Sequence, residues 1–215
     1  MGKLNMGVLG GFSGTVGTVI GSITRKGDDL IRVKSKIRRT SNTVGQMDQR
    51  SRFGLVLRLM RTLNILLKIG FKLFASDQMS SFNYASRKAM AQAIIGTYPD
   101  YEIDYSKLVI SEGLLAQVTS VTYEMMDGMI NFHWIGNLIG NSHPTDKMVL
   151  VIYNSTNRQL SYTIGVTTRV TKGGILPIPN SAIGDKLVLY LFLQSADDEQ
   201  VVSTSQYVGT IEVTE

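Results

Sequence analysis

The stretch from Thr40 to Phe74, TSNTVGQMDQRSRFGLVLRLMRTLNILLKIGFKLF, decides the fold that we predict for this chain. A helix drawn through it at about 100° per residue separates apolar from cationic side chains. The apolar side carries Phe53, Val56, Met60, Leu63 and Leu67, and the opposite side carries Arg50, Arg58, Arg61, Lys68 and Lys72. We therefore expect the apolar side to be buried and the cationic side to face solvent or a partner.

Local signals mark the ends of this helix and of a second one. The T-x-x-Q spacing that starts at Thr43 is typical of a capping box, so we expect the first helix to begin there. Either Ser76-Asp77 or Ser80 caps a second helix, which Gly96 and Pro99 stop. The second helix repeats small and apolar residues at helical spacing, namely Phe82, Ala85, Ala89 and Ala93. The pattern predicts a basic helical hairpin over residues 40–96.

Glycine dominates the segment before the helices. Residues 2–27 contain eight of the 21 glycines, which predicts either a flexible terminal arm or an arm that is ordered only when a neighbouring subunit offers it a sheet edge or groove. Residues 15–25 and 30–39 then predict two strands of a basic hairpin, with Ile31 and Val33 on one face. The other face carries the cations Arg32, Lys34, Lys36 and Arg38, and a further cation, Arg39, comes directly after them. This ribbon either protects a solvated edge strand or contacts phosphate or an acidic protein.

After residue 97 the composition changes to short alternating runs. They predict strands near 107–111, 117–125, 129–135, 147–153, 160–167, 187–194 and 201–213. Asp127-Gly128 is a strong hairpin signal, and Gly173-Gly174 and Pro177 read as breaks. The predicted fold class is therefore α+β, with an antiparallel sandwich of immunoglobulin or fibronectin III type at the carboxyl end. We expect three parts: the arm and hairpin (1–39), the helical hairpin (40–96) and an acidic sandwich (97–215).

The charge of +5 hides two halves of opposite sign. Residues 1–95 hold 16 Lys and Arg against 4 Asp, a net charge of +12, and residues 96–215 hold 6 cations against 13 acids, a net charge of −7. The basic half can meet nucleic acid, an acidic partner, or the acidic half of a second copy.

Catalytic chemistry is missing from the sequence pattern. The chain has no Cys, and its two histidines, His133 and His143, lack partners at a telling spacing. The acids around Asp100 and around Asp197 match no calcium loop. We therefore expect no enzyme activity, no cofactor, no metal and no small-molecule substrate. Four cations inside residues 55–73 cost about 2.5–3.5 kcal/mol each at mid-bilayer, so no membrane span is expected. Glycines interrupt the first residues, which predicts cytoplasmic synthesis without a signal peptide.

Three segments carry a resemblance to a known family. MGKLNMGVLGGFSGTVGTVIGS, TVGQMDQRSRF and YPDYEIDYSKLVISEG resemble a Bacteroidota family of about this length, described as a domain of unknown function, which implies no activity. The pattern T-x-x-Q-x-x-Q-R-x-x-F from Thr43 to Phe53 is similar to a segment of phage-related structural proteins, at the head of a helical hairpin.

The sequence therefore favours a non-enzymatic structural protein that self-associates, as a virion or phage-derived particle component does, through its arm and helices. We expect a homo-oligomer, or other structural subunits with an acidic surface, as the partner. Two alternatives stay open: a nucleic-acid-binding protein that uses the basic half, and a surface adhesion or carbohydrate-binding module.

Overall fold

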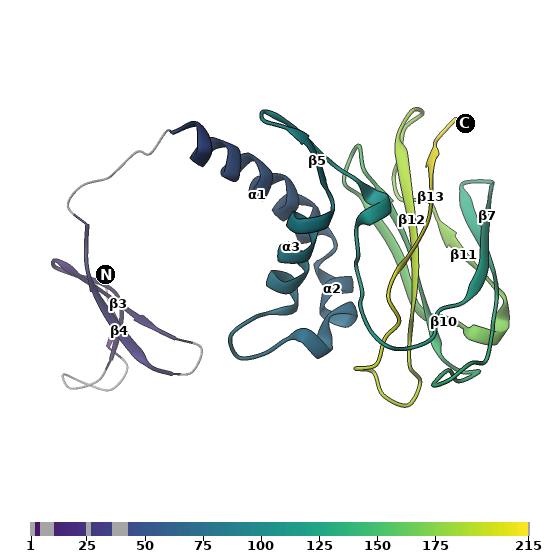
Figure 1. Ribbon diagram of the computed structural model, residues 1–215, viewed down its shortest axis with the longest axis horizontal. Helices are drawn as coiled ribbons and strands as arrows, with labels where there is room; N and C mark the ends of the chain where they lie inside the picture. The colour runs from purple at the N-terminus through teal and green to yellow at the C-terminus, as the bar shows by residue number, and fades with distance from the viewer. Residues whose placement is uncertain (1–2, 5–10, 25–26, 36–42, 215) are drawn as a thin grey trace.

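The structure is a computed structural model that describes residues 3–4, 11–24, 27–35 and 43–214. Over these residues the fold is mixed, with α-helices and several antiparallel sheets, and strands are the commoner element. Figure 1 shows three parts in a row: an amino-terminal sheet, a group of helices, and a carboxyl-terminal group of strands on the far side of the helices.

The amino-terminal part, which we call the arm sheet, has the strand order β1-β2-β3-β4. Its strands are β1 (Lys3–Leu4), β2 (Phe12–Val16), β3 (Val19–Ile23) and β4 (Asp29–Val33). The prediction of one strand over 15–25 was wrong, because the chain reverses after Val16, which pairs with Val19. Gly17 lies in that turn at φ +56°, a conformation that glycine adopts without strain. The second predicted strand ends at Val33, and residues 36–39 lie outside the described part.

The helical part forms as the periodicity predicted, with an extra break. It contains α1 (Val44–Thr62), α2 (Asn64–Gly70), the 3₁₀ turn η1 (Lys72–Phe74) and α3 (Ser81–Gln92). Thr43 is the N-cap of α1, but its side chain caps nothing, so the predicted capping box was wrong. Ser80 does cap α3, since its hydroxyl accepts from the Asn83 N–H at 3.2 Å.

A small hairpin joins the helices to the carboxyl-terminal strands. It consists of β5 (Ile94–Thr97) and β6 (Asp100–Ile103), in a segment that the sequence indicated only as a turn. The 3₁₀ turn η2 (Tyr105–Lys107) follows, where a strand over 107–111 had been predicted. The hydroxyl of Tyr101 donates to Asp48 of α1 at 2.5 Å, which holds the hairpin against the helix.

The carboxyl-terminal strands form two antiparallel sheets, ordered β10-β9-β12-β13 and β11-β8-β7. Their bounds are β7 (Thr119–Met126), β8 (Met129–Ile135), β9 (Lys147–Asn154), β10 (Leu160–Thr168), β11 (Gly173–Pro177), β12 (Lys186–Gln194) and β13 (Gln206–Glu212); the turn η3 (Arg169–Thr171) follows β10. Strand β11 was not predicted, because Gly173-Gly174 and Pro177 are typical of turns. A strand tolerates these residues where it is short and lies at the edge of a sheet, as β11 does.

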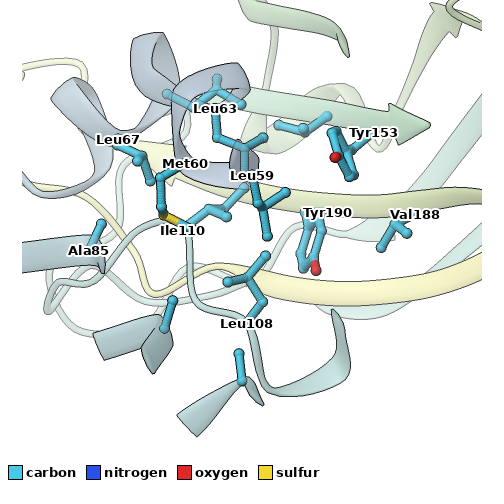
Figure 2. Close-up of a cluster of buried hydrophobic side chains, with 14 of the residues drawn as sticks. Leu59, Met60, Leu63, Leu67, Ala85, Leu108, Ile110, Tyr153, Val188 and Tyr190 are labelled. Atoms are coloured by element: carbon cyan, nitrogen blue, oxygen red, sulfur yellow. The ribbon is translucent and has the colours of Figure 1, made fainter. Parts of the chain in front are cut away.

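Both faces of β9 and β12 are buried, and this makes the molecule three layers thick. On one face, Phe132 and Trp134 of β8 pack against alternate residues of β9 and β12. On the other face the helices cover the sheet. Leu59 and Met60 of α1 belong to one buried cluster with Tyr153 of β9 and Tyr190 of β12, and Figure 2 shows Leu59 near Tyr190 and Met60 beside Ile110. The helices therefore pack on the sheet as well as on each other.

Candidate partner-binding surfaces

The arm sheet is amphipathic, and its apolar face is uncovered. The register places six apolar side chains on one face, which we call the arm face: Phe12, Val16, Val19, Ile23, Ile31 and Val33. Strand β4 is exposed along its whole length, with Ile31 66% and Val33 76% exposed. Among the described residues of the arm sheet whose burial is assigned, Gly21 alone is buried. A sheet of this kind usually needs a packed apolar face to be stable, so the arm face requires a cover.

The cations predicted for the arm divide into those that the structure describes and those that it does not. Arg32 lies on β4, on the face opposite Ile31 and Val33, and is exposed. Lys34 follows the strand, and its backbone N–H donates to the Thr18 carbonyl at 2.7 Å. Lys36, Arg38 and Arg39 lie outside the described residues.

Three of the predicted helix cations lie together on α1. Arg50, Arg58 and Arg61 line a hollow of about 410 Å³ with Ser51, Gly54 and Leu57, which we call the basic hollow. Gly54 faces open space, since a Cβ at this position would meet nothing within 4 Å. The only sequence signal for this hollow is a glycine one helical turn from two arginines, a spacing that by itself predicts no site.

The other two helix cations do not join the hollow. Lys68 lies on α2 and Lys72 on η1, both exposed, beyond the break that ends α1. No acid of the described chain forms an ion pair with Arg58, Arg61, Lys68 or Lys72. Arg58, Arg61, Lys68 and Lys72 are therefore open to an anionic partner.

In the described residues, no group of three or more acids and histidines is placed so that it could hold a metal ion. Asp48 binds Tyr101, and this hydrogen bond raises the pKa of the tyrosine. His143 forms a hydrogen bond of 2.7 Å with Thr145 in a loop, and His133 is exposed on the outer face of β8. Within the same residues, no helix combines the length and apolarity needed to cross a bilayer.

A further surface, which the sequence did not indicate, lies between two edge strands. β10 and β11 are edges of their respective sheets, and between them lies a cleft of about 550 Å³ that we call the edge cleft. It is lined by Asn131, Phe132, His133, Thr163, Val166, Thr167, Gly173, Gly174 and Ile175. The only available signal was the Gly173-Gly174 pair, which we had interpreted as a break.

The edge cleft contains polar atoms without partners. Asn131 Oδ1 and Thr167 Oγ1 are shielded from water, and within the described chain neither forms a hydrogen bond. Such an atom costs about 1–3 kcal/mol when it stays unsatisfied. The rest of the lining is mainly apolar, and Val166 is 78% exposed.

Comparison with known proteins places the chain in a family. No curated protein matches its sequence. One family model, described as a family of unknown function (DUF6266), matches residues 11–209. The match runs from the arm sheet through the helices to β13, so it includes each surface described above. The protein therefore belongs to DUF6266, a family of unknown function.

Proposed function

We propose that this protein is a structural, self-associating subunit whose arm sheet docks on another copy. One observation carries the proposal: the arm face is an apolar sheet surface that nothing in the described chain covers. Burial of an apolar side chain contributes about 1.5–3 kcal/mol, so four to six such side chains in one face favour association strongly. The proposed role is non-enzymatic.

Charge supports association between unlike parts of two copies. The arm sheet and the helices belong to the half with a net charge of +12, whereas the two carboxyl-terminal sheets belong to the half with a net charge of −7. Contact between the basic part of one copy and the acidic part of the next aligns opposite charges, whereas contact between like parts is penalised. A heterologous contact of this kind closes into rings or continues as arrays.

The finer form of the proposal follows from the sequence resemblances. We infer a particle component of virion or phage-derived type, in a Bacteroidota context, whose two stacked carboxyl-terminal sheets form a sandwich of immunoglobulin or fibronectin III type. The subunit carries the sandwich as its body and the arm as its connector.

Light scattering coupled to size-exclusion chromatography tests the function. The full chain is expected to elute as an oligomer, and a chain lacking residues 1–35 is expected to elute as a monomer with an unchanged thermal midpoint, because the arm contributes little to the core. A full chain that stays monomeric at high concentration contradicts the proposal.

The basic hollow favours a second candidate function, nucleic-acid binding. Arg50, Arg58 and Arg61 line the basic hollow, and Arg58 and Arg61 form no ion pair with an acid of the described chain. Fluorescence anisotropy with labelled DNA and RNA at about 50 mM salt tests it, since phosphate binding weakens steeply with salt. Arg58→Glu with Arg61→Glu is expected to abolish binding, and Lys172→Glu with Lys186→Glu, at exposed lysines of the carboxyl-terminal half, is the charge-matched control. No binding by the native chain at that salt dismisses this function.

A further inference from the structure

The edge cleft lies between two strands that each have one unpaired side. β11 pairs only with β8, and β10 pairs only with β9, among the described strands. The two strands approach each other at Thr167 and Gly174, where a Cβ on Gly174 would lie 3.2 Å from Thr167 Oγ1. A sheet edge presents a row of backbone N–H and C=O groups to which an extended segment can add.

β4 of the arm sheet has the matching properties. It has five residues, as β11 does, and it is also an edge strand, paired only with β3 in the described chain. All five of its residues are exposed. The described structure therefore contains an uncovered strand that can be donated, β4, and an edge strand of equal length that can accept it, β11.

We propose that β4 of one copy adds to β11 of a second copy, so that the arm sheet of the first continues the sheet β11-β8-β7 of the second. The edge cleft is then the acceptor site for the arm. This inference rests on the proposed self-association and identifies the surface to which the arm binds.

The side-chain alternation of β4 fits this site. With Ile31 and Val33 directed into the cleft, they meet the apolar lining around Phe132 and Val166, and the arm face turns inward. Leu30 and Arg32 then project from the outer face, because successive strand residues point to opposite sides.

The same orientation supplies the missing hydrogen-bond donors. Asn131 alternates with the buried Ile130 and Phe132, so its side chain belongs to the outer face of β8, across Ile175 from the added strand. The Arg32 guanidinium, with its five N–H donors, is on that face and satisfies Asn131 Oδ1. The added backbone brings further N–H groups to the cleft beside Thr167, whose hydroxyl has no partner in the described chain.

A second copy is the occupant that the arrangement favours over the chain's own arm. In Figure 1 the arm sheet lies on one side of the helices, and β11 and β7 lie on the other. The helices and the sheet β10-β9-β12-β13 therefore stand between the arm and the cleft of the same chain. Insertion of a chain's own arm into its own cleft is an outcome that the crosslinking below detects.

A charge placed in the cleft gives the first test. Val166→Glu is expected to reduce the association constant of the full chain at least tenfold, because Ile31 and Val33 would bury that carboxylate. Ile183→Glu is the matched control, since Ile183 is 77% exposed, close to the 78% of Val166, and lies outside the cleft lining. Circular dichroism establishes that both variants fold. Equal association of the Val166 and Ile183 variants overturns the inference.

Crosslinking gives the second test, which the absence of cysteine makes clean. Leu30→Cys and Ile175→Cys, both on the outer face, are made in two full-length chains of different tag mass, mixed, and treated with a short bis-maleimide. The expected product is the mixed dimer. Leu30→Cys with Thr122→Cys, on the opposite edge strand β7, is expected to give little. The inference is overturned by equal yields from both pairs, or by an intramolecular crosslink in a chain carrying both Leu30→Cys and Ile175→Cys.

The outcomes separate this inference from the function on which it rests. Oligomers that need residues 1–35 but neither respond to Val166→Glu nor give the mixed crosslink leave the assembly function standing and refute the acceptor site. A full chain that is monomeric at high concentration refutes both.

Discussion

At the scale of single residues, the strongest polar constraint in the described chain is a buried ion pair. The Arg169 and Asp146 side chains are fully buried, 3.0 Å apart. Nε of Arg169 donates to Asp146 Oδ2 at 3.0 Å, Nη1 donates to the Asn137 carbonyl, and Nη2, the nitrogen of the ion pair, also donates to the Ala116 carbonyl. The Arg169 carbonyl accepts from the Trp134 indole at 3.0 Å. One arginine thus joins the ends of β8 and β10 to the segment before β7.

Arg169→Ala is expected to lower the free energy of unfolding by about 3–5 kcal/mol, because it leaves Asp146 as an unpaired buried charge. Urea denaturation measures this loss. Arg158→Ala, at an exposed arginine of the loop before β10, is the control and is expected to change stability by less than about 0.5 kcal/mol. Equal effects would show that the ion pair contributes nothing of its own.

Asp185 makes stability depend on pH. Its pKa is lowered because its carboxylate accepts hydrogen bonds from the Ala182 N–H at 3.0 Å and from the Asn154 amide at 2.7 Å. A lowered carboxyl pKa gives stability that is complete above the usual value of about 3.9 and is lost as the pH falls through the lowered value.

Asp185→Asn is therefore expected to be less stable than the native chain at pH 7, and the difference should shrink as the pH falls below about 4. Denaturant melts between about pH 2 and pH 7 measure it. Asp197→Asn, at an exposed loop position, is the matched control. A difference that stays constant with pH contradicts the assignment.

At the scale of elements, the contact between the helices and the sheet carries much of the core. Met60 of α1 is fully buried in the cluster that the helices share with β9 and β12, and burial raises the pKa of Tyr153, on the sheet side of that cluster, to about 12. The helical side of β9 and β12 therefore excludes water.

Met60→Ala is expected to destabilise the protein by about 2–5 kcal/mol, since it leaves a cavity among residues that relax only in part. Ile65→Ala, half-exposed on α2, is the control and is expected to cost much less. A thermal melt of each variant compares them. If Met60→Ala melts no lower than Ile65→Ala, the helices do not share a core with the sheet.

Strong periodicity made some elements predictable and others not. The bounds of β8 were predicted to the residue, and α1 begins where Thr43 indicated, because long alternating or helical patterns reflect burial of one face. β11 and the β5–β6 hairpin were missed, since glycine and proline in short edge strands resemble turns. The edge cleft and the Arg169–Asp146 pair join residues distant in sequence, and no local pattern encodes such pairings.

The stripe of α1 was predictable only in part. Val56, Met60, Leu63 and Leu67 are buried as expected, but Phe53 is 46% exposed beside a groove between α1 and α3. The cations Arg50, Arg58 and Arg61 do gather on one face, as the helical spacing predicted. That the same helix would lie on the strands of the carboxyl-terminal half was not predicted, because an apolar stripe does not specify what covers it.

At the scale of the whole molecule, the layers depend on one another. A fragment of residues 97–215 would expose the side of β9 and β12 that the helices cover: Val149, Val151, Tyr153, Val188, Tyr190 and Phe192. An exposed patch of this kind favours aggregation. The fragment is expected to aggregate or to bind a hydrophobic dye, whereas the chain lacking residues 1–35 stays soluble. Dynamic light scattering compares the two, and a monodisperse fragment contradicts the prediction.

The double burial of β9 and β12 also bears on how the chain is made. The ribosome completes α3 at Gln92, but β12, which helps to cover the helices, begins only at Lys186. At a synthesis rate of about 5–20 residues per second, the apolar face of the nascent helices stays exposed for about 5–20 s before β12 is synthesised. We therefore expect the helices to pack on β9 and β12 only when translation nears its end. Until then, the exposed apolar face of the nascent helices is a surface to which a chaperone at the ribosome exit binds.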